Sequence, residues 1–249
     1  SPLVPPLFLN LALRSQTMPT LTKYALRVHA DYSSVVFPIG VADFVGDGEF
    51  DGKRLELAGN GTLTLAGDIA IEIHGKGQLT MIIEGVASAT IRTFVRDELE
   101  VVYSGTVETV RIVHDVRLEG GATYRERIAA DVHGLFDAMT TVTHDGKALS
   151  DIVTKVAVHE GGKAIVRGKI VMGNGAEGST GTERIDALLL GEKAEADVLP
   201  TMVIDTDDVA CKHGASVGHM DENALFYLAS RGVDPAAARA VLTEAFLQF

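Results

Sequence analysis

Short runs in which apolar and polar residues alternate follow one another through most of the chain. Val, Ile, Leu or Thr recur along each run, Gly, Asp or Asn bound it, and a new run begins about every 8–12 residues. The clearest runs are TLTLAG (62–67), AIEIHG (70–75), QLTMIIEG (78–85), ELEVVYSG (98–105), TYRERIAADV (123–132) and KAIVRGKIVM (163–172). No helix-length periodic segment interrupts them, which argues against βαβ units. The pattern predicts an all-β core over residues 41–219, built as a sandwich, a barrel or a solenoid.

Signals for tight hairpins are scarce in this β-rich region. Asn-Gly pairs favour the two-residue turns of antiparallel hairpins, and the chain has two of them, Asn60-Gly61 and Asn174-Gly175. Many short strands with few hairpins favour a solenoid, in which each strand stacks on the turn of chain below it. The residues alone still leave the sandwich open.

Helical signals appear near the C-terminus. Asp221 is a suitable N-cap for a first helix, and Gly232 is a suitable residue to end it. Asp234 and Pro235 form the start of a second helix. One side of this second helix is apolar and consists of Val241, Leu242, Ala245, Phe246 and Phe249. We expect a helical pair over residues 220–249, whose apolar face either packs on the β-core or docks another protein.

Composition and charge narrow the possible partners. The chain has 249 residues, which suits one domain or one large domain with a small appendage, and 46% of them are hydrophobic. A formal net charge of −12 repels phosphate backbones, so we expect no nucleic-acid partner. No run is long and apolar enough to cross a bilayer, so we expect no membrane partner. A single cysteine excludes an internal disulfide and is compatible with a reducing cytoplasm.

Residues 1–40 differ from the β-rich region. They combine an apolar run with prolines at positions 2, 5 and 6, and they lack the basic start of a signal peptide. A possible strand, LTKYALRVHA, covers residues 21–30. We interpret the segment as one that tethers or packs, and Met18 leaves open where the native start lies.

The segment 205–233, DTDDVACKHGASVGHMDENALFYLASRGV, carries the candidate chemistry. Cys211, the chain's one cysteine, is followed by His213 and His219, and thiolate and imidazole are good ligands for zinc, iron and iron–sulfur centres. A structural zinc site needs four ligands, and a chain with one cysteine has no cysteine pair to contribute to them. The residues alone leave open a metal site, a structural cysteine and a Cys–His nucleophile pair. The acidic residues around Asp207 lack EF-hand spacing and predict a solvated turn.

We interpret the remaining motifs as structural. Residues 173–178 match G-x-G-x-x-G, but no convincing helix starts there, so they predict a glycine-rich turn and not a dinucleotide site. His144 and His159 stand beside glycine and acidic residues and are interpreted as turn residues. A carboxylate pair for glycoside hydrolysis cannot be singled out among the 34 acidic residues.

The stretch 207–233 resembles the C-terminal signature of the SufB/SufD family, scaffold proteins of the SUF iron–sulfur cluster assembly system. A D-D-V-x-C-x-H-G-A-x-V-G run is followed by a D-E-x-A-L-F-Y-L-x-S-R-G helix. Residues 163–204 are also similar to the family, including the leucines at 188–190 and the Ala-Asp-Val-Leu-Pro at 196–200. The resemblance covers residues 140–249 well and the earlier β-rich part loosely, and this chain is compact beside typical members.

The resemblance implies a fold, a partner and an assembly. The family's fold is a right-handed parallel β-helix flanked by helices, which would divide this chain into an N-terminal segment (1–40), a β-helix core (41–219) and a C-terminal helical segment (220–249). The family's C-terminal helices dock onto SufC, an ABC-type ATPase, and its proteins pair through their β-helices, with the cluster forming at that interface. The implied ATPase-docking residues are Asp221, Leu225, Phe226, Tyr227 and Arg231.

Residue by residue, the chain is similar to the SufD branch. Cys211 and His213 match its C-x-H-G turn, where the histidine lies at the cluster-forming interface. The SufB branch has a sulfur-accepting cysteine where this chain has Ile185, and a glutamate after the histidine where this chain has Gly214. In a homodimer, a two-fold axis near the turn would bring two copies of Cys211 and His213 together. We therefore take Cys211 and His213 as the main candidate cluster-binding residues, with His219 and Asp207 as secondary candidates beside them.

These features lead us to expect an iron–sulfur scaffold subunit and not an enzyme. It would hold a transient cluster at a subunit interface in the cytoplasm. Its partners would be a SufC-type ATPase and either a second copy of the chain or a SufB-type paralogue. Two alternatives stay open: a carbohydrate-active enzyme on a β-solenoid, and a SufD-like subunit that stabilises a complex without binding metal.

Overall fold

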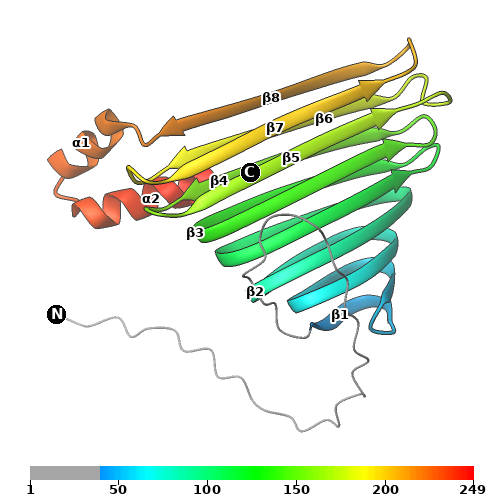
Figure 1. Cartoon of the computed structure of the whole chain (residues 1–249), viewed down its shortest axis with the longest axis horizontal. Helices are drawn as coiled ribbons and strands as arrows, with labels where there is room; N and C mark the ends of the chain where they lie inside the picture. The colour runs from blue at the N-terminus through cyan, green and yellow to red at the C-terminus, as the bar shows by residue number, and fades with distance from the viewer. Residues whose placement is uncertain (1–39) are drawn as a thin grey trace, which may run out of the picture.

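The computed structural model describes residues 40–249, and strands make up most of this part of the chain (Figure 1). The prediction of an all-β core followed by a short helical segment is confirmed. The possible strand at 21–30, and all but the last residue of the predicted segment 1–40, lie outside the described residues. In chain order the elements are β1 (Val41–Phe50), β2 (Arg54–Leu118), β3 (Thr123–His144), β4 (Leu149–Val158), β5 (Lys163–Met172), β6 (Thr180–Leu189), β7 (Glu195–Ile204), β8 (Ala210–His219), α1 (Glu222–Ser230) and α2 (Pro235–Leu247).

Two parallel ladders build the body of the molecule. The first, here called the β8 ladder, pairs residues 98–107 of β2 with 123–132 of β3 and continues through β4, β6 and β8. The second, the β7 ladder, pairs residues 109–118 of β2 with 135–144 of β3 and continues through β5 and β7. The chain alternates between the ladders and returns to each one every 25 to 32 residues. Figure 1 shows the result as a stack with β8 at one end and β1 at the other.

The core lies between the two ladders. Buried and more exposed residues alternate along β3, β4 and β5, because successive side chains of a strand point to opposite faces of the sheet. Tyr124 from the β8 ladder and Phe136 from the β7 ladder are among the largest fully buried side chains. Removal of this apolar surface from water is the main stabilising term for such a body. In β5 the buried apolar residues are Ala164, Val166, Ile170 and Met172.

The first part of the stack departs from the prediction of separate short strands. Strand pairing continues from Arg54 to Leu118 as one element, β2. The chain bends inside this element at glycines, and Gly67, Gly75 and Gly77 have φ angles of 75°, 128° and 115°. Glycine adopts positive φ at little cost, so the chain changes direction at these positions without ending the strand.

Neither Asn-Gly pair forms a tight hairpin. Asn60-Gly61 lies inside β2, where Gly61 pairs with Gly46 of β1. Asn174-Gly175 lies in the turn between β5 and β6, two strands that belong to different ladders. The pairing from residue 98 to residue 219 is parallel throughout, which is what the scarcity of hairpin signals indicated.

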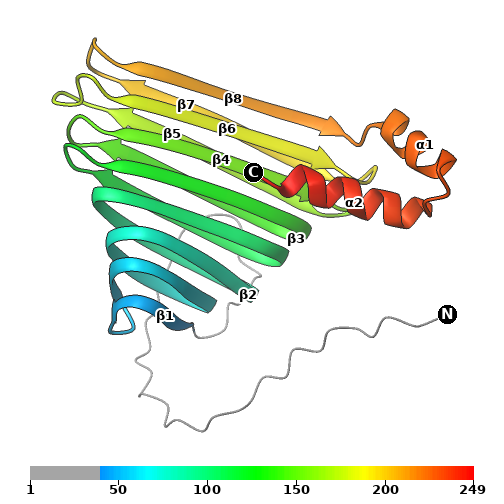
Figure 2. The same cartoon turned by 180° about the vertical axis from the view of Figure 1, so that it is seen from behind.

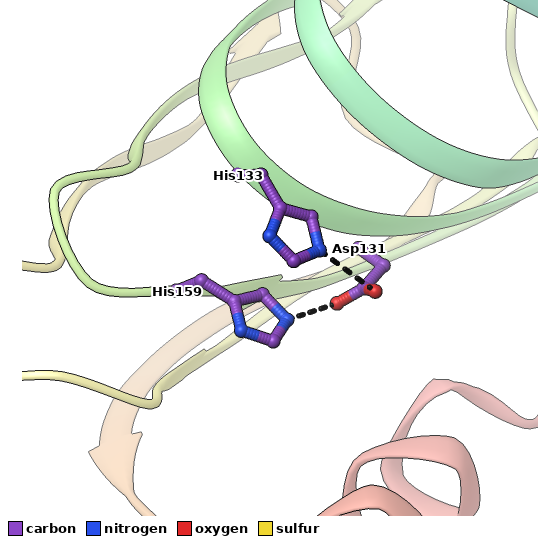
Figure 3. A group of neighbouring side chains, drawn as sticks. All are labelled: Asp131, His133 and His159. Carbon is purple, nitrogen blue, oxygen red and sulfur yellow. Dashed lines mark hydrogen bonds and ion pairs between the residues drawn. The ribbon is translucent and has the colours of Figure 1, made fainter.

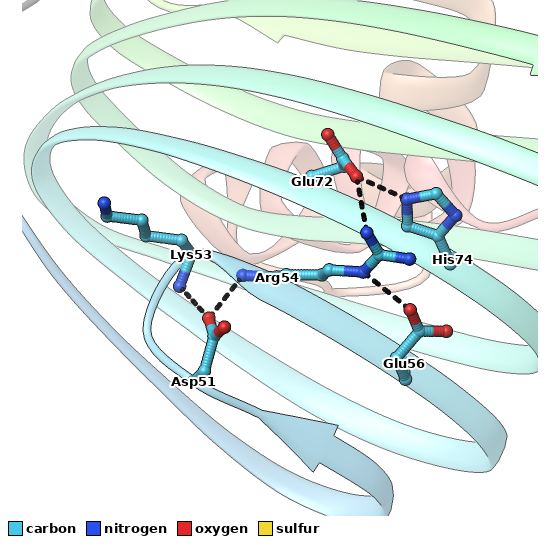
Figure 4. Close-up of polar contacts among 6 residues, drawn as sticks. All are labelled: Asp51, Lys53, Arg54, Glu56, Glu72 and His74. Atoms are coloured by element: carbon cyan, nitrogen blue, oxygen red, sulfur yellow. Dashed lines mark hydrogen bonds and ion pairs between the residues drawn. The ribbon is translucent and has the colours of Figure 1, made fainter.

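A hairpin between β1 and β2 closes the end of the stack opposite to β8 (Figure 1). Asp51 Oδ1 accepts backbone hydrogen bonds from Lys53 and Arg54 at 2.9 and 2.8 Å (Figure 4), and these bonds hold the pKa of Asp51 below its ordinary value. The Arg54 side chain pairs with Glu56 at 2.6 Å and with Glu72 at 3.4 Å. Because solvent screens exposed ion pairs, the backbone bonds to Asp51 define this turn more than the charges do.

The helical pair follows β8 directly, as predicted. Asp221 caps α1 by accepting from the Asn223 N–H at 2.9 Å, and Gly232, with a φ of 80°, follows its end. Asp234 caps α2, and Pro235 is its first residue. The capping signals in the sequence therefore located both helices.

The two helices differ in their contact with the strands (Figure 2). Helix α2 packs against β4 and β3, and Ala238 is its fully buried residue. Lys155 of β4 donates to the carbonyl of Gln248, and its Nζ lies 5.8 and 5.4 Å from the ring centres of Phe246 and Phe249. Helix α1 has no buried residue. Packing on the β-core thus holds for α2, and α1 stays exposed.

In the part of the chain that the structure describes, neither helix is long and apolar enough to cross a bilayer.

Because successive turns stack closely, residue 134 has no room for a side chain. A Cβ atom at this residue of β3 would lie 1.8 Å from the carbonyl oxygen of Glu108 in the turn below, whereas one at Gly120 would have no atom of the described residues within 4 Å. We expect Gly134→Ala to lower the free energy of unfolding by about 1–3 kcal/mol, because backbone must move to admit the methyl group. Gly120→Ala should change it by less than about 1 kcal/mol. Urea unfolding followed by circular dichroism compares the two, and equal midpoints would contradict the stacking.

Candidate functional site

The end of the stack at β8 carries the residues that the sequence singled out. β8 pairs with β6 along one edge, and its other edge pairs with no strand among residues 40–249. Cys211 is in register with Gly181 of β6, and His213 is in register with Glu183. Gly181 and Glu183 are buried, and neighbours in register point to the same face of a sheet. Cys211 and His213 therefore continue the inner face of the stack at its open end.

Cys211 sits at the boundary between the core and solvent. Its side chain packs against the apolar core, and its Sγ lies 3.3 Å from the sulfur of Met172. Burial raises the pKa of the Cys211 thiol. A nucleophilic cysteine needs a lowered pKa, so this environment does not support the Cys–His nucleophile that the residues alone left open. A thiol at this place still becomes a strong ligand when a metal displaces its proton.

The other predicted cluster-binding residues are spread along the edge. His213 is exposed and two residues from Cys211, whereas His219 is exposed at the opposite end of β8, about 26 Å from Cys211 by the rise of a strand. Asp207 is exposed in the turn before β8. Within residues 40–249, none of these four belongs to a group of three His, Cys, Asp or Glu ligand atoms close enough to share one ion.

Glu183, which the motifs did not single out, lies directly below His213. It is 2% exposed, and its Oε2 has no hydrogen-bond partner among residues 40–249. Its side chain crosses the interior towards the β7 ladder, where a Cβ on Gly168 would lie 1.2 Å from Glu183 Oε1. Burial and the negative charge of Glu126 raise the pKa of Glu183 to about 8. The signal was present in ERIDALLL, where period two places Glu183 on the same inner face as Ile185.

A second buried acid lies two turns deeper. Glu126 is in register with Ile152, which is in register with Glu183. Unlike Glu183, Glu126 has hydrogen-bond partners for both of its carboxylate oxygens. Although burial raises its pKa, the charge of His114 and three hydrogen bonds hold the pKa of Glu126 below its ordinary value. The three partners of its carboxylate are His114 Nδ1 at 2.7 Å, Tyr124 Oη at 2.7 Å and Thr140 Oγ1 at 2.8 Å. Polar groups thus extend through the core towards the open end.

The predicted docking residues lie on the exposed helix α1 or beside it. Phe226 is 76% exposed and Tyr227 is 57% exposed, which is unusual for large apolar side chains. Arg231 lies 5.3 Å from the ring centre of Tyr227, and Leu225 is half-buried. Asp221 is exposed and caps the helix.

The predictions for the other motifs have mixed outcomes. Residues 173–178 form a turn between β5 and β6 with no helix, so their interpretation as a glycine-rich turn is confirmed. His159 lies in the turn after β4, as predicted. His144 is not a turn residue: it ends β3, is buried, and its Nε2 lies 2.9 Å from Ser150 Oγ. Burial lowers the pKa of His144 to about 4.

The carbohydrate-active alternative requires a groove with two free carboxyl groups, one of them held neutral. A hollow over β2 does contain three acidic residues. Each of them contacts a basic or amide side chain, so none of the three is a free carboxyl group. The pairs are Asp97 with Lys76, Glu98 with Arg125, and Glu100 with Gln78.

Comparison with known proteins gives a consistent result. Residues 100–246 match the family described as SUF system FeS cluster assembly, SufBD core domain. The chain is 36% identical over 111 residues to the iron–sulfur cluster assembly protein SufD of Escherichia coli, covering 44% of this chain and 26% of that protein. It is 37% identical over 99 residues to an iron–sulfur cluster assembly SufBD family protein of Mycobacterium tuberculosis, covering 40% of this chain and 12% of that protein. Iron–sulfur cluster assembly protein SufB of Bacillus subtilis is 33% identical over 99 residues, covering 40% and 21%. The chain thus matches about a quarter or less of the length of these relatives.

The buried carboxyl group of Glu183 should make the free energy of unfolding depend on pH. Because the pKa of Glu183 is raised to about 8 in the folded state, the folded chain keeps a proton that the unfolded chain loses above about pH 4.5. Stability therefore falls as pH rises between these values, by up to about 1.4 kcal/mol per pH unit. We expect Glu183→Gln to remove this part of the slope, measured by urea unfolding at pH 5.5 and 7.5. Exposed Glu192→Gln is the control, and the same slope in Glu183→Gln and the native chain would contradict the assignment.

Proposed function

The chain belongs to the SufBD core-domain family of the SUF system, and from this premise we propose that it is a scaffold subunit for iron–sulfur cluster assembly and not an enzyme. A role in iron–sulfur cluster assembly follows from the family. The family match spans both ladders, β8 and most of the helical pair. The observation that carries the scaffold proposal is the open edge of β8, with a thiol and an imidazole on its inner face.

We infer that the two ladders form a right-handed parallel β-helix. The parallel registers and the return of the chain to each ladder every 25 to 32 residues support this inference. The hand is the one that nearly all connections between parallel strands adopt. The β-helix would span residues 41–219, and the helical segment 220–249 would form a separate ATPase-docking unit.

The cluster would assemble where two β8 edges meet. A free edge of unpaired N–H and C=O groups is a template for a strand from another chain. If a second copy adds its β8 about a two-fold axis near residues 211–213, two thiols and two imidazoles come together and supply four ligands. A SufB-type paralogue in place of the second copy would bring its own ligands to the same edge. His219 and Asp207 would flank this interface.

Glu183 would complete the site from below. It is in register with His213, and its Oε2 has no partner within the described residues. A neutral carboxyl group at this place can release its proton when cationic iron arrives above it, and the carboxylate then offsets the charge of the metal. Iron and sulfide are cargo here, so the protein's task is to hold and release them.

The helical pair would dock a SufC-type ABC ATPase in the cytoplasm. Exposed aromatic side chains are typical anchors of protein interfaces, and α1 presents Phe226 and Tyr227. Helix α2 is fixed to β4 through Lys155, so a force on the helices reaches the ladder that ends in β8. A SufD-like subunit that stabilises a complex without binding metal would share this docking surface and would not need Cys211.

Docking on α1 can be tested by removing its two exposed rings. We expect Phe226→Ala/Tyr227→Ala to weaken binding of the SufC-type ATPase from the same source at least tenfold, because such anchors carry more than about 1 kcal/mol each. Folding should be unchanged, since α1 has no buried residue. Leu199→Ala, which removes an exposed apolar side chain of β7, is the control. Pull-down and titration calorimetry measure the effect, and unchanged affinity would place the ATPase elsewhere.

Cluster binding at β8 gives a second test. After anaerobic reconstitution with ferric and ferrous iron and sulfide, we expect the native chain to show iron–sulfur charge-transfer absorption and Cys211→Ser and His213→Ala to lose most of it. Ala215→Ser, on the same face of β8, should retain it. Both ligand variants should still bind the ATPase. No cluster on the native chain would leave the stabilising-subunit alternative. Full cluster on Cys211→Ser would contradict the assignment of the site to β8.

A further inference from the structure

A group of side chains with metal-ligand chemistry lies at a corner of the stack, away from β8 (Figure 3). Asp131 and His133 are two residues apart near the middle of β3, where the chain passes from the β8 ladder to the β7 ladder. His159 follows the end of β4. Val132 is in register with Val158, and the His159 N–H donates to the Val132 carbonyl at 2.9 Å. The parallel register thus stacks the two corners and brings residues 28 positions apart into contact.

The three side chains converge on one point. His159 Nε2 lies 2.7 Å from Asp131 Oδ1, and His133 Nε2 lies 3.3 Å from Asp131 Oδ2. The two imidazole rings are stacked with their centres 3.9 Å apart and their planes at 13°. One ligand atom from each residue falls within 4.8 Å of the others. Both histidines therefore direct the same nitrogen, Nε2, at a single carboxylate, as two arms of a chelate do.

We propose that Asp131, His133 and His159 bind one divalent transition-metal ion. Bonds of about 2.0–2.2 Å from an ion to imidazole nitrogen and carboxylate oxygen place neighbouring ligand atoms about 3 Å apart, close to the separations seen here. Two imidazoles and one carboxylate favour Zn²⁺ or Fe²⁺ over Mg²⁺ and Ca²⁺, which prefer oxygen ligands. The net charge of −12 favours the arrival of a cation.

The surroundings indicate a site that loads and releases its ion. The side chains of His133, Asp131 and His159 are 40%, 29% and 34% exposed, so an ion can enter and water can fill the remaining coordination positions. The backbone beneath them is held firmly. The His159 carbonyl accepts from the Gly162 N–H at 2.9 Å, and Gly134 packs against the carbonyl of Glu108. Ligands on a fixed backbone lose little entropy when they bind.

This site is distinct from the one at Cys211. In the β8 ladder Asp131 is in register with Ala157, Ala157 with Leu188, and Leu188 with Gly218. Gly218 is seven residues from Cys211, which corresponds to about 23 Å along the strand. Asp131 also lies on the outer face, because Ala130 and Val132 on either side of it are buried. The proposal does not depend on a cluster at β8.

The test is a titration of the metal-free full-length chain with Co²⁺, followed by visible absorption, and with Zn²⁺ in competition. We expect one equivalent to bind at this site and the affinity to fall at least tenfold in His133→Gln and in His159→Gln. Asp131→Asn should also weaken binding. Two controls bind as the native chain does: His219→Gln, which removes an exposed histidine elsewhere, and Cys211→Ser/His213→Gln, which removes the proposed cluster site.

The melting temperature distinguishes a variant that has lost the metal site from one that does not fold. Zn²⁺ in excess should raise the melting temperature of the native chain and of Cys211→Ser/His213→Gln, and should leave that of His133→Gln/His159→Gln unchanged. Equal Co²⁺ affinity in the native chain and His133→Gln/His159→Gln would overturn the proposal. Loss of binding in Cys211→Ser/His213→Gln alone would also overturn it, by placing the ion at β8.

Discussion

The parallel register between successive turns of the chain is the constraint on which the rest of this structure depends. Each residue of a ladder aligns with one found 25 to 32 positions later, so side chains far apart in the sequence form columns. One column sets His213 over Glu183, and stacked corners bring His159 to Asp131. A shift of one residue would exchange the inner and outer faces of a strand, so the ladder hydrogen bonds fix both candidate sites.

The interior also shows how buried charge is handled along the stack. Deep in the core, Glu126 is charged and satisfied by three neighbours, which makes it a stable part of the packing. Glu183, two turns nearer to the open end, has an oxygen with no partner in the part of the chain that the structure describes, and it costs stability when it ionises. Unsatisfied groups of this kind concentrate at functional sites. Glu183 lies under the residues proposed to hold the cluster, so a role in binding iron would explain why the chain keeps a buried acid that lowers its stability.

The sequence predicted what depends on neighbouring residues. Period-two runs gave the strands, and Asp221, Gly232 and Asp234-Pro235 gave both helices. What it missed depends on how successive turns of the chain stack, which joins residues up to 28 positions apart. The continuity of β2 follows from bends at single glycines, and the burial of His144 follows from its stacking beside Ser150. The contact of Asp131 with His159 requires the length of each turn, and the turns differ in length, so no repeat in the sequence discloses it.

The central claim is that β8 edges meet and bring their thiols together. Cys211 is the chain's one cysteine, so a short bis-maleimide can join two chains only through two copies of it. The measurement is cross-linking of the purified chain at a concentration where its mass in solution is known. The account predicts a cross-linked dimer in high yield, which Val217→Lys at the same edge suppresses. A chain that stays monomeric, or a dimer whose two Cys211 each react with a single-headed maleimide but never with one another, would contradict it.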